Sequence, residues 1–256
     1  MTPDCVTLWI GDSLGPVERA CARSVLRQGH KLSLYCYGDV RGVPDGVEVR
    51  DASEIISESR IVYHRSGSPG LFADWFRLEL QRRGLGTWLD LDMYLIGPID
   101  LSDPYLLAEE EPGLINNAVL RLPPDCPMLP LLLDVFERPT TPAWLPWYWY
   151  YPARLRELIS GSADLTRMPW GTTGAYGLTW LARRFGLYSR AYPPDTFYPS
   201  GWRDAAWILD PSIGLEDILT PRTLGVHLSN EAIRPYKNSP APSGSFLERL
   251  QQEGRQ

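Results

Sequence analysis

Apolar residues along this chain alternate between short continuous runs and stretches with helical spacing. The runs at residues 5–11 and 31–37 are typical of buried strands, whereas residues 16–28 place apolar side chains on one stripe and carry proline near the start. The same pattern predicts further strands at 46–49, 87–96, 114–122 and 223–228, and helices at 69–83, 127–136 and 174–185. Strands that alternate with helices predict an α/β fold, a single domain with a mostly parallel central sheet and helices on both faces.

The C-terminal segment differs from the rest in composition. Residues 238–245 read Asn-Ser-Pro-Ala-Pro-Ser-Gly-Ser, which is typical of a flexible or extended segment. We therefore predict a folded domain at residues 1–237 and a flexible tail at 238–256, in which residues 246–256 form a polar, loosely attached helix. A chain of 256 residues is long enough for one domain of this kind.

Charge and composition exclude several classes of protein. A formal net charge of −6 and a pI near 5.2 argue against nucleic acid as a partner, because binding it requires a basic face. The sequence has no apolar run of about 18 residues, so no transmembrane segment is expected. The N-terminus shows no secretory signal, which predicts a cytoplasmic location. The four dispersed cysteines are expected to be reduced packing residues.

Two carboxylates, Asp90 and Asp92, stand in the otherwise apolar run at 87–96. Residues i and i+2 of an extended chain project from the same face, and burying ionised carboxylates is costly unless they are paired or bound to a metal. The pair therefore predicts a divalent cation. Mg²⁺ and Mn²⁺ prefer carboxylate oxygens and are usually shared with the phosphates of a substrate, so a nucleoside diphosphate is the expected ligand.

The predicted helix before this strand carries Asp74 and Arg77 at positions i and i+3, on one face. These two side chains could form an ordinary surface ion pair. Alternatively, the helix places an acid and a guanidinium in the same pocket as Asp90 and Asp92.

Residues 73–77 (Ala-Asp-Trp-Phe-Arg), followed by 84–92 (Gly-Leu-Gly-Thr-Trp-Leu-Asp-Leu-Asp), resemble the sugar-binding region of the Asp-x-Asp glycosyltransferases. These include the α1,4-galactosyltransferases, the yeast initiating mannosyltransferases and capsular polysaccharide enzymes, and more distantly the clostridial glucosylating toxins. The helix and the acidic pair are spaced as in that family without a gap. Looser similarity extends from about residue 5 to residue 235.

The resemblance implies a GT-A type fold and a metal-dependent, retaining transfer of a hexose in polysaccharide biosynthesis. The donor would be a nucleotide-diphosphate sugar, with a UDP-sugar favoured, and the acceptor a saccharide or lipid-linked saccharide. Asp92 would ligate Mn²⁺ or Mg²⁺, and Asp90 would contact the ribose or a metal-bound water. Asp74 and Arg77 would reach donor hydroxyls and the phosphate side, and His227 would complete the metal shell.

Further candidates for the donor site have different grounds: the resemblance for the tryptophan, closeness to His227 for the serine, charge for the lysine, and apolar surroundings for the asparagines and threonines. They are Trp9, for the nucleobase, and Asn116, Asn117, Thr172, Thr173, Ser229 and Lys237. Structural alternatives stay open for them: the tryptophan could pack in a core, the asparagines and threonines could cap backbone groups, and the lysine could be solvated. A single histidine at 227 could also be structural.

Residues 144–151 contain six aromatic side chains. They could stack on an acceptor saccharide, approach a membrane headgroup layer as a peripheral contact, or form an aromatic mini-core beneath a loop.

Two other functions were weighed. A nucleotide-sugar-binding module that keeps the fold without turnover is compatible with the same residues. An aspartate-nucleophile phosphatase also carries Asp-x-Asp after an apolar strand, but Tyr94 stands where that motif needs a small hydroxyl residue, and no later paired-aspartate loop follows.

Overall fold

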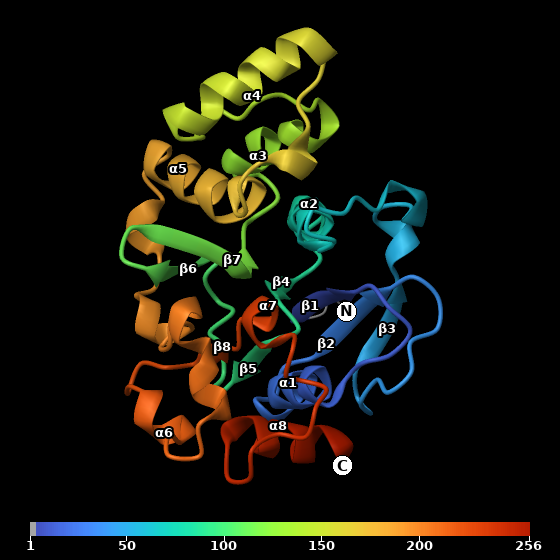
Figure 1. The fold of residues 1–256 in the computed structure, drawn as a ribbon, viewed down its shortest axis with the longest axis vertical. Coiled ribbons are helices and arrows are strands. Elements are labelled where there is room, and N and C mark those ends of the chain that lie inside the picture. Colours follow the sequence, from blue (N-terminus) through green and yellow to red (C-terminus); the bar gives the residue numbers. More distant parts are fainter. Residues whose placement is uncertain (1–3) are drawn as a thin grey trace.

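The computed structural model describes residues 4–256, and residues 1–3, with which the predicted domain begins, lie outside the described part. Its centre is a six-stranded sheet in the order β3-β2-β1-β4-β7-β6 (Figure 1). The strands are β1 (Cys5–Trp9), β2 (Leu32–Cys36), β3 (Glu48–Asp51), β4 (Thr87–Leu89), β6 (Leu106–Glu111) and β7 (Leu114–Arg121). The first four in spatial order pair in parallel, and β7 and β6 add antiparallel pairs. This mainly parallel α/β sheet confirms the predicted fold class.

Helices cover both faces of the sheet, as predicted. In Figure 1, α1 (Pro16–Arg27) lies on one side of the β1–β2 pair and α2 (Gly70–Arg82) lies on the other. The α2 face packs around Phe72, Phe76 and Trp88. The other helices are α3 (Met128–Glu137), α4 (Trp147–Ser160), α5 (Gly177–Arg184), α6 (Leu215–Ile218), α7 (Asn230–Ile233) and α8 (Phe246–Arg255).

The predicted strand at 87–96 is wrong as a single element, because the chain breaks at residues 90–92. The backbone N–H of Met93 donates to the carbonyl of Asp90 at 2.9 Å and closes a turn. After the turn, β5 (Met93–Leu95) leaves the large sheet and pairs with β8 (Gly225–His227) in a separate two-stranded ribbon. The acidic pair therefore lies in a turn and not on one face of a strand.

The strand β6 and the helices α4, α6 and α7 were not predicted. The second half of β6 is acidic, which hides its strand character. In α4, Pro146 and Pro152 flank and interrupt the aromatic sequence, which hides its helical character. In the structure, Pro146 is the N-cap and Pro152 lies within the helix.

The C-terminal helix α8 is not loosely attached, contrary to the prediction. Its side chains Phe246, Leu247 and Leu250 are buried, and the helix packs along α1. Ser245 caps it by accepting a hydrogen bond from the backbone N–H of Glu248. The apolar stripe is short and flanked by charged residues, which is why the sequence alone indicated weak packing.

All four cysteines are buried, as expected of packing residues. Within residues 4–256, no helix combines the length and the apolar character that crossing a bilayer requires.

Candidate functional site

Three predicted metal ligands meet at the turn between β4 and β5. Asp90, Asp92 and His227 each offer one ligand atom, and these atoms lie within 4.8 Å of one another. The antiparallel pairing of β5 with β8 sets Met93 opposite His227, which brings the histidine beside the acidic turn. The pairing of β5 with β8 therefore brings together residues that are more than 130 positions apart in the sequence.

Asp92 and His227 form an ion pair. Nε2 of the imidazole lies 3.4 Å from Oδ1 of Asp92. Burial lowers the pKa of His227, but the charges of Asp92 and then of Asp90 outweigh burial and raise it to about 9. Burial opposes the charge of Asp92, yet His227 and the backbone N–H of Asn230 hold the pKa of this carboxyl at about 2. A divalent cation would replace the proton of this imidazole, because only the neutral ring has a lone pair for a metal.

A short backbone segment after β8 holds Asp92 from two sides. The N–H of Asn230 donates to Oδ2 of Asp92 at 2.6 Å, and the N–H of Leu228 donates to its backbone carbonyl at 3.0 Å. Between them, Ser229 has φ 54°, the only positive φ of a non-glycine residue within residues 4–256. A left-handed serine costs free energy, and such residues are concentrated at functional sites.

Asp90 is held from the side of the large sheet. The indole N–H of Trp88 donates to its Oδ1 at 2.6 Å, and Nη1 of Arg77 lies 3.1 Å from the same atom. Burial raises the pKa of Asp90, Arg77 opposes this, and the charge of Asp92 adds to it. The two carboxylates thus have different hydrogen-bond partners and opposite pKa shifts, although they are only two residues apart.

Arg77 is buried under the site and is fully engaged there. Its guanidinium donates to the carbonyls of Ala73 and Asn117, pairs with Asp74 and Asp90, and lies 4.7 Å from the centre of a tryptophan ring. Its side chain is only 5% exposed. The i, i+3 pair of the sequence is therefore not a surface ion pair. This geometry directs the guanidinium towards two carboxylates and two carbonyls, and we assign it a positioning role in place of the expected contact with phosphate.

Asp74 accepts hydrogen bonds from two of the residues that the sequence predicts for the donor site. Its Oδ1 accepts a hydrogen bond from the side-chain amide of Asn117 at 2.8 Å, and its Oδ2 accepts one from the hydroxyl of Thr173 at 2.7 Å. Asn117 comes from β7 and Thr173 from a single π-helical turn (Thr172–Tyr176) that leads into α5. Three predicted residues from three elements therefore form one polar group.

Two other candidates have different partners. The amide of Asn116 donates to Glu110 at 2.8 Å, on the neighbouring strand β6. The hydroxyl of Thr172 donates to the carbonyl of Pro169 at 2.7 Å, so the capping alternative describes Thr172.

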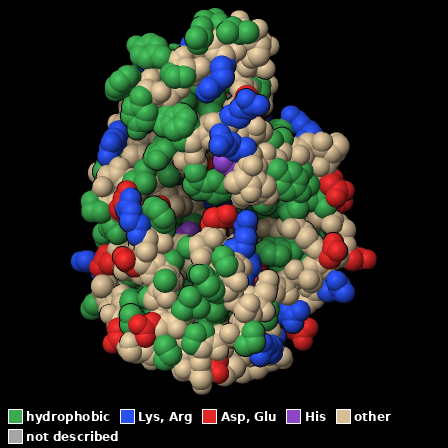
Figure 2. Space-filling view, in the orientation of Figure 1, with side chains coloured by type: hydrophobic (Ala, Val, Ile, Leu, Met, Phe, Trp, Pro, Cys, Tyr) green, Lys and Arg blue, Asp and Glu red, His purple; other side chains and the backbone are tan. Residues whose placement is uncertain are grey.

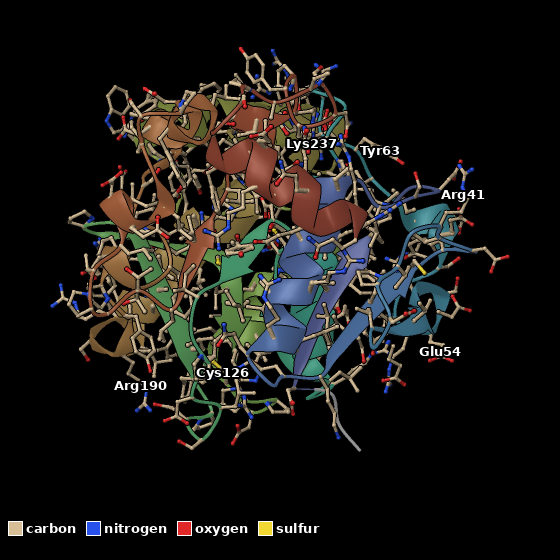
Figure 3. All side chains as sticks on the ribbon, turned by 90° about the horizontal axis from the view of Figure 1, so that it is seen from below. Arg41, Glu54, Tyr63, Cys126, Arg190 and Lys237 are labelled. Atoms are coloured by element: carbon tan, nitrogen blue, oxygen red, sulfur yellow. The ribbon has the colours of Figure 1, made fainter. Side chains whose placement is uncertain are left out.

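Lys237 is neither solvated nor available to a diphosphate as the sequence suggested. Its ammonium donates to the buried carboxylate of Glu18 and, at 2.6 Å, to the side chain of Asn230. It also lies 5.9 Å from the centre of the Trp9 ring, whose buried indole nitrogen has no hydrogen-bond partner in the structure. Figure 3 labels this lysine beside the C-terminal helix. Lys237 thus supports the backbone segment that holds Asp92.

We expect Lys237→Met to lower the free energy of unfolding by about 3 kcal/mol, because it leaves the buried carboxylate of Glu18 unpaired. The double variant Glu18→Gln/Lys237→Met should recover at least half of that loss. Arg234→Met, which breaks a surface pair, serves as the control and should change stability by less than about 0.5 kcal/mol. Urea unfolding followed by circular dichroism measures all three. Equal losses in the single and double variants would contradict the pairing.

Two residues of this neighbourhood were missed by sequence reasoning. Tyr198 packs its ring edge-on against His227, with centroids 5.4 Å apart, and its buried hydroxyl has no partner in the structure. Glu110 holds Asn116, and its charge acts on both His227 and Tyr198. Neither belongs to a recognisable motif, because β6 was not predicted and the tyrosine lies in a segment without strand or helix periodicity.

The three potential ligands Asp90, Asp92 and His227 and their surroundings fit a divalent cation. Nδ1 of His227 is buried without a hydrogen-bond partner, which leaves one ring nitrogen unsatisfied. Two carboxylates and an imidazole are a common ligand set for divalent metals. Figure 2 shows a hollow across the middle of this face, with acidic and histidine side chains along it.

Comparisons with known proteins do not identify a family for this chain. No protein-family model matches the sequence, and no curated protein matches it. Among solved structures, the chain is similar to one described as "PaToxG Glycosyltransferase", with 11% sequence identity and a TM-score of 0.46, over 74% of this chain and 72% of that chain. The functional argument therefore rests on the side chains.

Proposed function

We propose that this protein is a metal-dependent glycosyltransferase that transfers a hexose, with retention of configuration, from a nucleotide-diphosphate sugar to a saccharide or lipid-linked saccharide. A UDP-sugar is the favoured donor. The observation that carries the proposal is the convergence of Asp90, Asp92 and His227 in one partly buried cluster beside Asp74 and Arg77. The resemblance to the Asp-x-Asp glycosyltransferases implies a role for each of these residues, and the folded chain brings them together.

Asp92, His227 and Asp90 would hold the cation. When bound, Mn²⁺ or Mg²⁺ supplies positive charge against the diphosphate that leaves with the nucleotide. Asp92 contributes the ligand of lower pKa: the backbone N–H of Asn230 donates to its carboxylate, and that of Leu228 donates to its backbone carbonyl. Asp90, fixed by Arg77 and Trp88, contributes the second carboxylate.

The polar group of Asp74, Asn117 and Thr173 would bind the sugar of the donor. A carboxylate that already accepts from an amide and a hydroxyl is oriented by them, and it retains acceptor capacity for sugar hydroxyls. Trp9 would stack on the nucleobase, and the ammonium of Lys237 lies over its ring. These assignments place the sugar on the α2 side of the cation and the base on the β1 side.

The proposal predicts that nucleotide sugars bind only with metal. In a thermal-shift screen of UDP- and GDP-sugars, we expect a UDP-sugar to raise the melting temperature in the presence of Mn²⁺ and to have no effect in EDTA. We also expect slow release of UDP from that donor without acceptor, lost in EDTA. Binding without any release of nucleotide would favour the non-catalytic module, and binding that is unchanged in EDTA would contradict the metal site.

A further inference from the structure

The helix α4 is exposed over almost its whole circumference. Of its fourteen residues, only Ala153 and Glu157 are buried. Its exposed large apolar side chains are Trp147, Tyr148, Trp149, Tyr151, Leu155, Leu158 and Ile159. In a soluble monomer, contiguous exposed apolar surface of this kind marks a site of interaction.

The apolar side of α4 points away from the protein. At about 100° per residue, Ala153 and Glu157 mark the edge that faces the protein, and Tyr148, Leu155 and Ile159 lie on the opposite edge. An ordinary surface helix has its apolar stripe on the side of the core. Leu155 is 61% exposed and Ile159 is 80% exposed, so neither contributes to the folded core.

The charges on α4 are arranged around this outward stripe. The same helical spacing puts Arg154 on one border of the stripe and Arg156 on the other. Glu157, the only acidic residue of the helix, is turned inward, where it pairs with Arg154 and accepts from the backbone N–H of Thr141 at 2.8 Å. The exposed charged side chains of α4 are therefore all basic.

We propose that α4 docks on the surface of a lipid bilayer that contains anionic lipid, with its axis in the plane of the headgroups. Leu155 and Ile159 enter the acyl boundary, and tyrosine and tryptophan occupy the headgroup level. Arg156 extends to lipid phosphates, beside Arg154, whose guanidinium is half-exposed and also pairs with Glu157. This surface is independent of the glycosyltransferase assignment.

The charges on α4 favour a bilayer over a second copy of the chain as the binding partner of this helix. A two-fold contact would place the stripe of one helix on the same stripe of the other. Arg154 and Arg156 would then approach the same arginines of the partner, and the one acid of each helix, Glu157, is turned inward and already paired with its own Arg154. An anionic headgroup layer supplies the negative charge that such a contact lacks.

The position of α4 in the fold permits docking without covering the cation cluster. Figure 1 places α4 at one end of the molecule, with α3 and α5 between it and the strands β4 and β5. Figure 2 shows apolar side chains gathered at that end, separate from the central hollow. A bilayer bound to α4 would therefore leave the cation cluster uncovered.

Flotation of the full chain with vesicles tests this proposal. We expect the protein to float with phosphatidylcholine–phosphatidylserine vesicles and to bind less to phosphatidylcholine alone. The double variant Leu155→Glu/Ile159→Glu should lower the bound fraction roughly tenfold, because two carboxylates replace the inserted side chains. Val49→Glu, on the exposed face of β3, makes the same kind of change elsewhere and should bind like the wild type.

Three outcomes would overturn the proposal. One is failure of the wild type to float with either vesicle, and another is equal binding by the double variant and the wild type. The third is a wild-type dimer in sedimentation equilibrium that the double variant converts to a monomer, which would identify a second copy as the occupant. Circular dichroism should show the same unfolding midpoint for the variants, because the replaced side chains are exposed.

Discussion

Asp92→Asn is expected to lower turnover by about 10³-fold and to abolish tight Mn²⁺ binding, while the fold persists. The substitution removes the charge of a proposed metal ligand at nearly constant shape. The hydrogen bond from the backbone N–H of Asn230 can still be accepted by the amide oxygen, so the surrounding segment keeps its support. Calorimetric titration with Mn²⁺ measures the site without reference to activity, and donor hydrolysis measures turnover.

Asp100→Asn is the matched control, since this aspartate is exposed and only bonds to the local N–H of Ser102. It should bind Mn²⁺ like the wild type. Retention of wild-type Mn²⁺ affinity by Asp92→Asn would remove this residue from the metal shell, whatever happens to turnover.

Arg77→Met is expected to destabilise the protein by about 3 kcal/mol, the cost of removing one partner of a buried ion pair. The substitution leaves Asp74 and Asp90 without their shared cation and two backbone carbonyls without a donor. Arg77→Lys should be intermediate, because one ammonium cannot reproduce the separate directions of the guanidinium N–H groups. Urea unfolding gives both values.

The Arg77 variants also separate a positioning role from a contact with substrate. If the arginine positions Asp90, Arg77→Lys should weaken Mn²⁺ binding in the absence of any nucleotide. If it instead contacts phosphate, Mn²⁺ affinity should stay unchanged and only donor affinity should fall. Arg83→Lys, at the exposed end of the same helix, should leave Mn²⁺ affinity and stability at wild-type values.

Elements that depend on the local spacing of apolar residues were predicted correctly from the sequence. The helix α2 was correctly predicted because its apolar residues follow helical spacing and Gly84 ends it. The β1–α1–β2 unit was correct for the same reason. The break at residues 90–92 was not predictable in this way, because it depends on the pairing of β5 with a strand more than 130 residues later.

The sequence indicated which residues form the candidate site, but not how deeply they are buried or which partners they have. Asp74, Asp90, Asp92 and His227 do lie close together. However, an i, i+3 pair has the same sequence whether it is solvated or buried, so the burial of Arg77 could not be foreseen. Lys237 was expected near phosphate or solvent, and its partner Glu18 lies more than 200 residues away on α1.

The break between β4 and β5 gives the two carboxylates different attachments. Asp90 is tied to the large sheet through Trp88 and Arg77, whereas Asp92 is tied to the two-stranded ribbon through His227 and Asn230. A ligand that both carboxylates share therefore links two separately hydrogen-bonded layers. A cation bound by both carboxylates would therefore cross-link the two-stranded ribbon to the large sheet at the turn where the chain passes from one to the other.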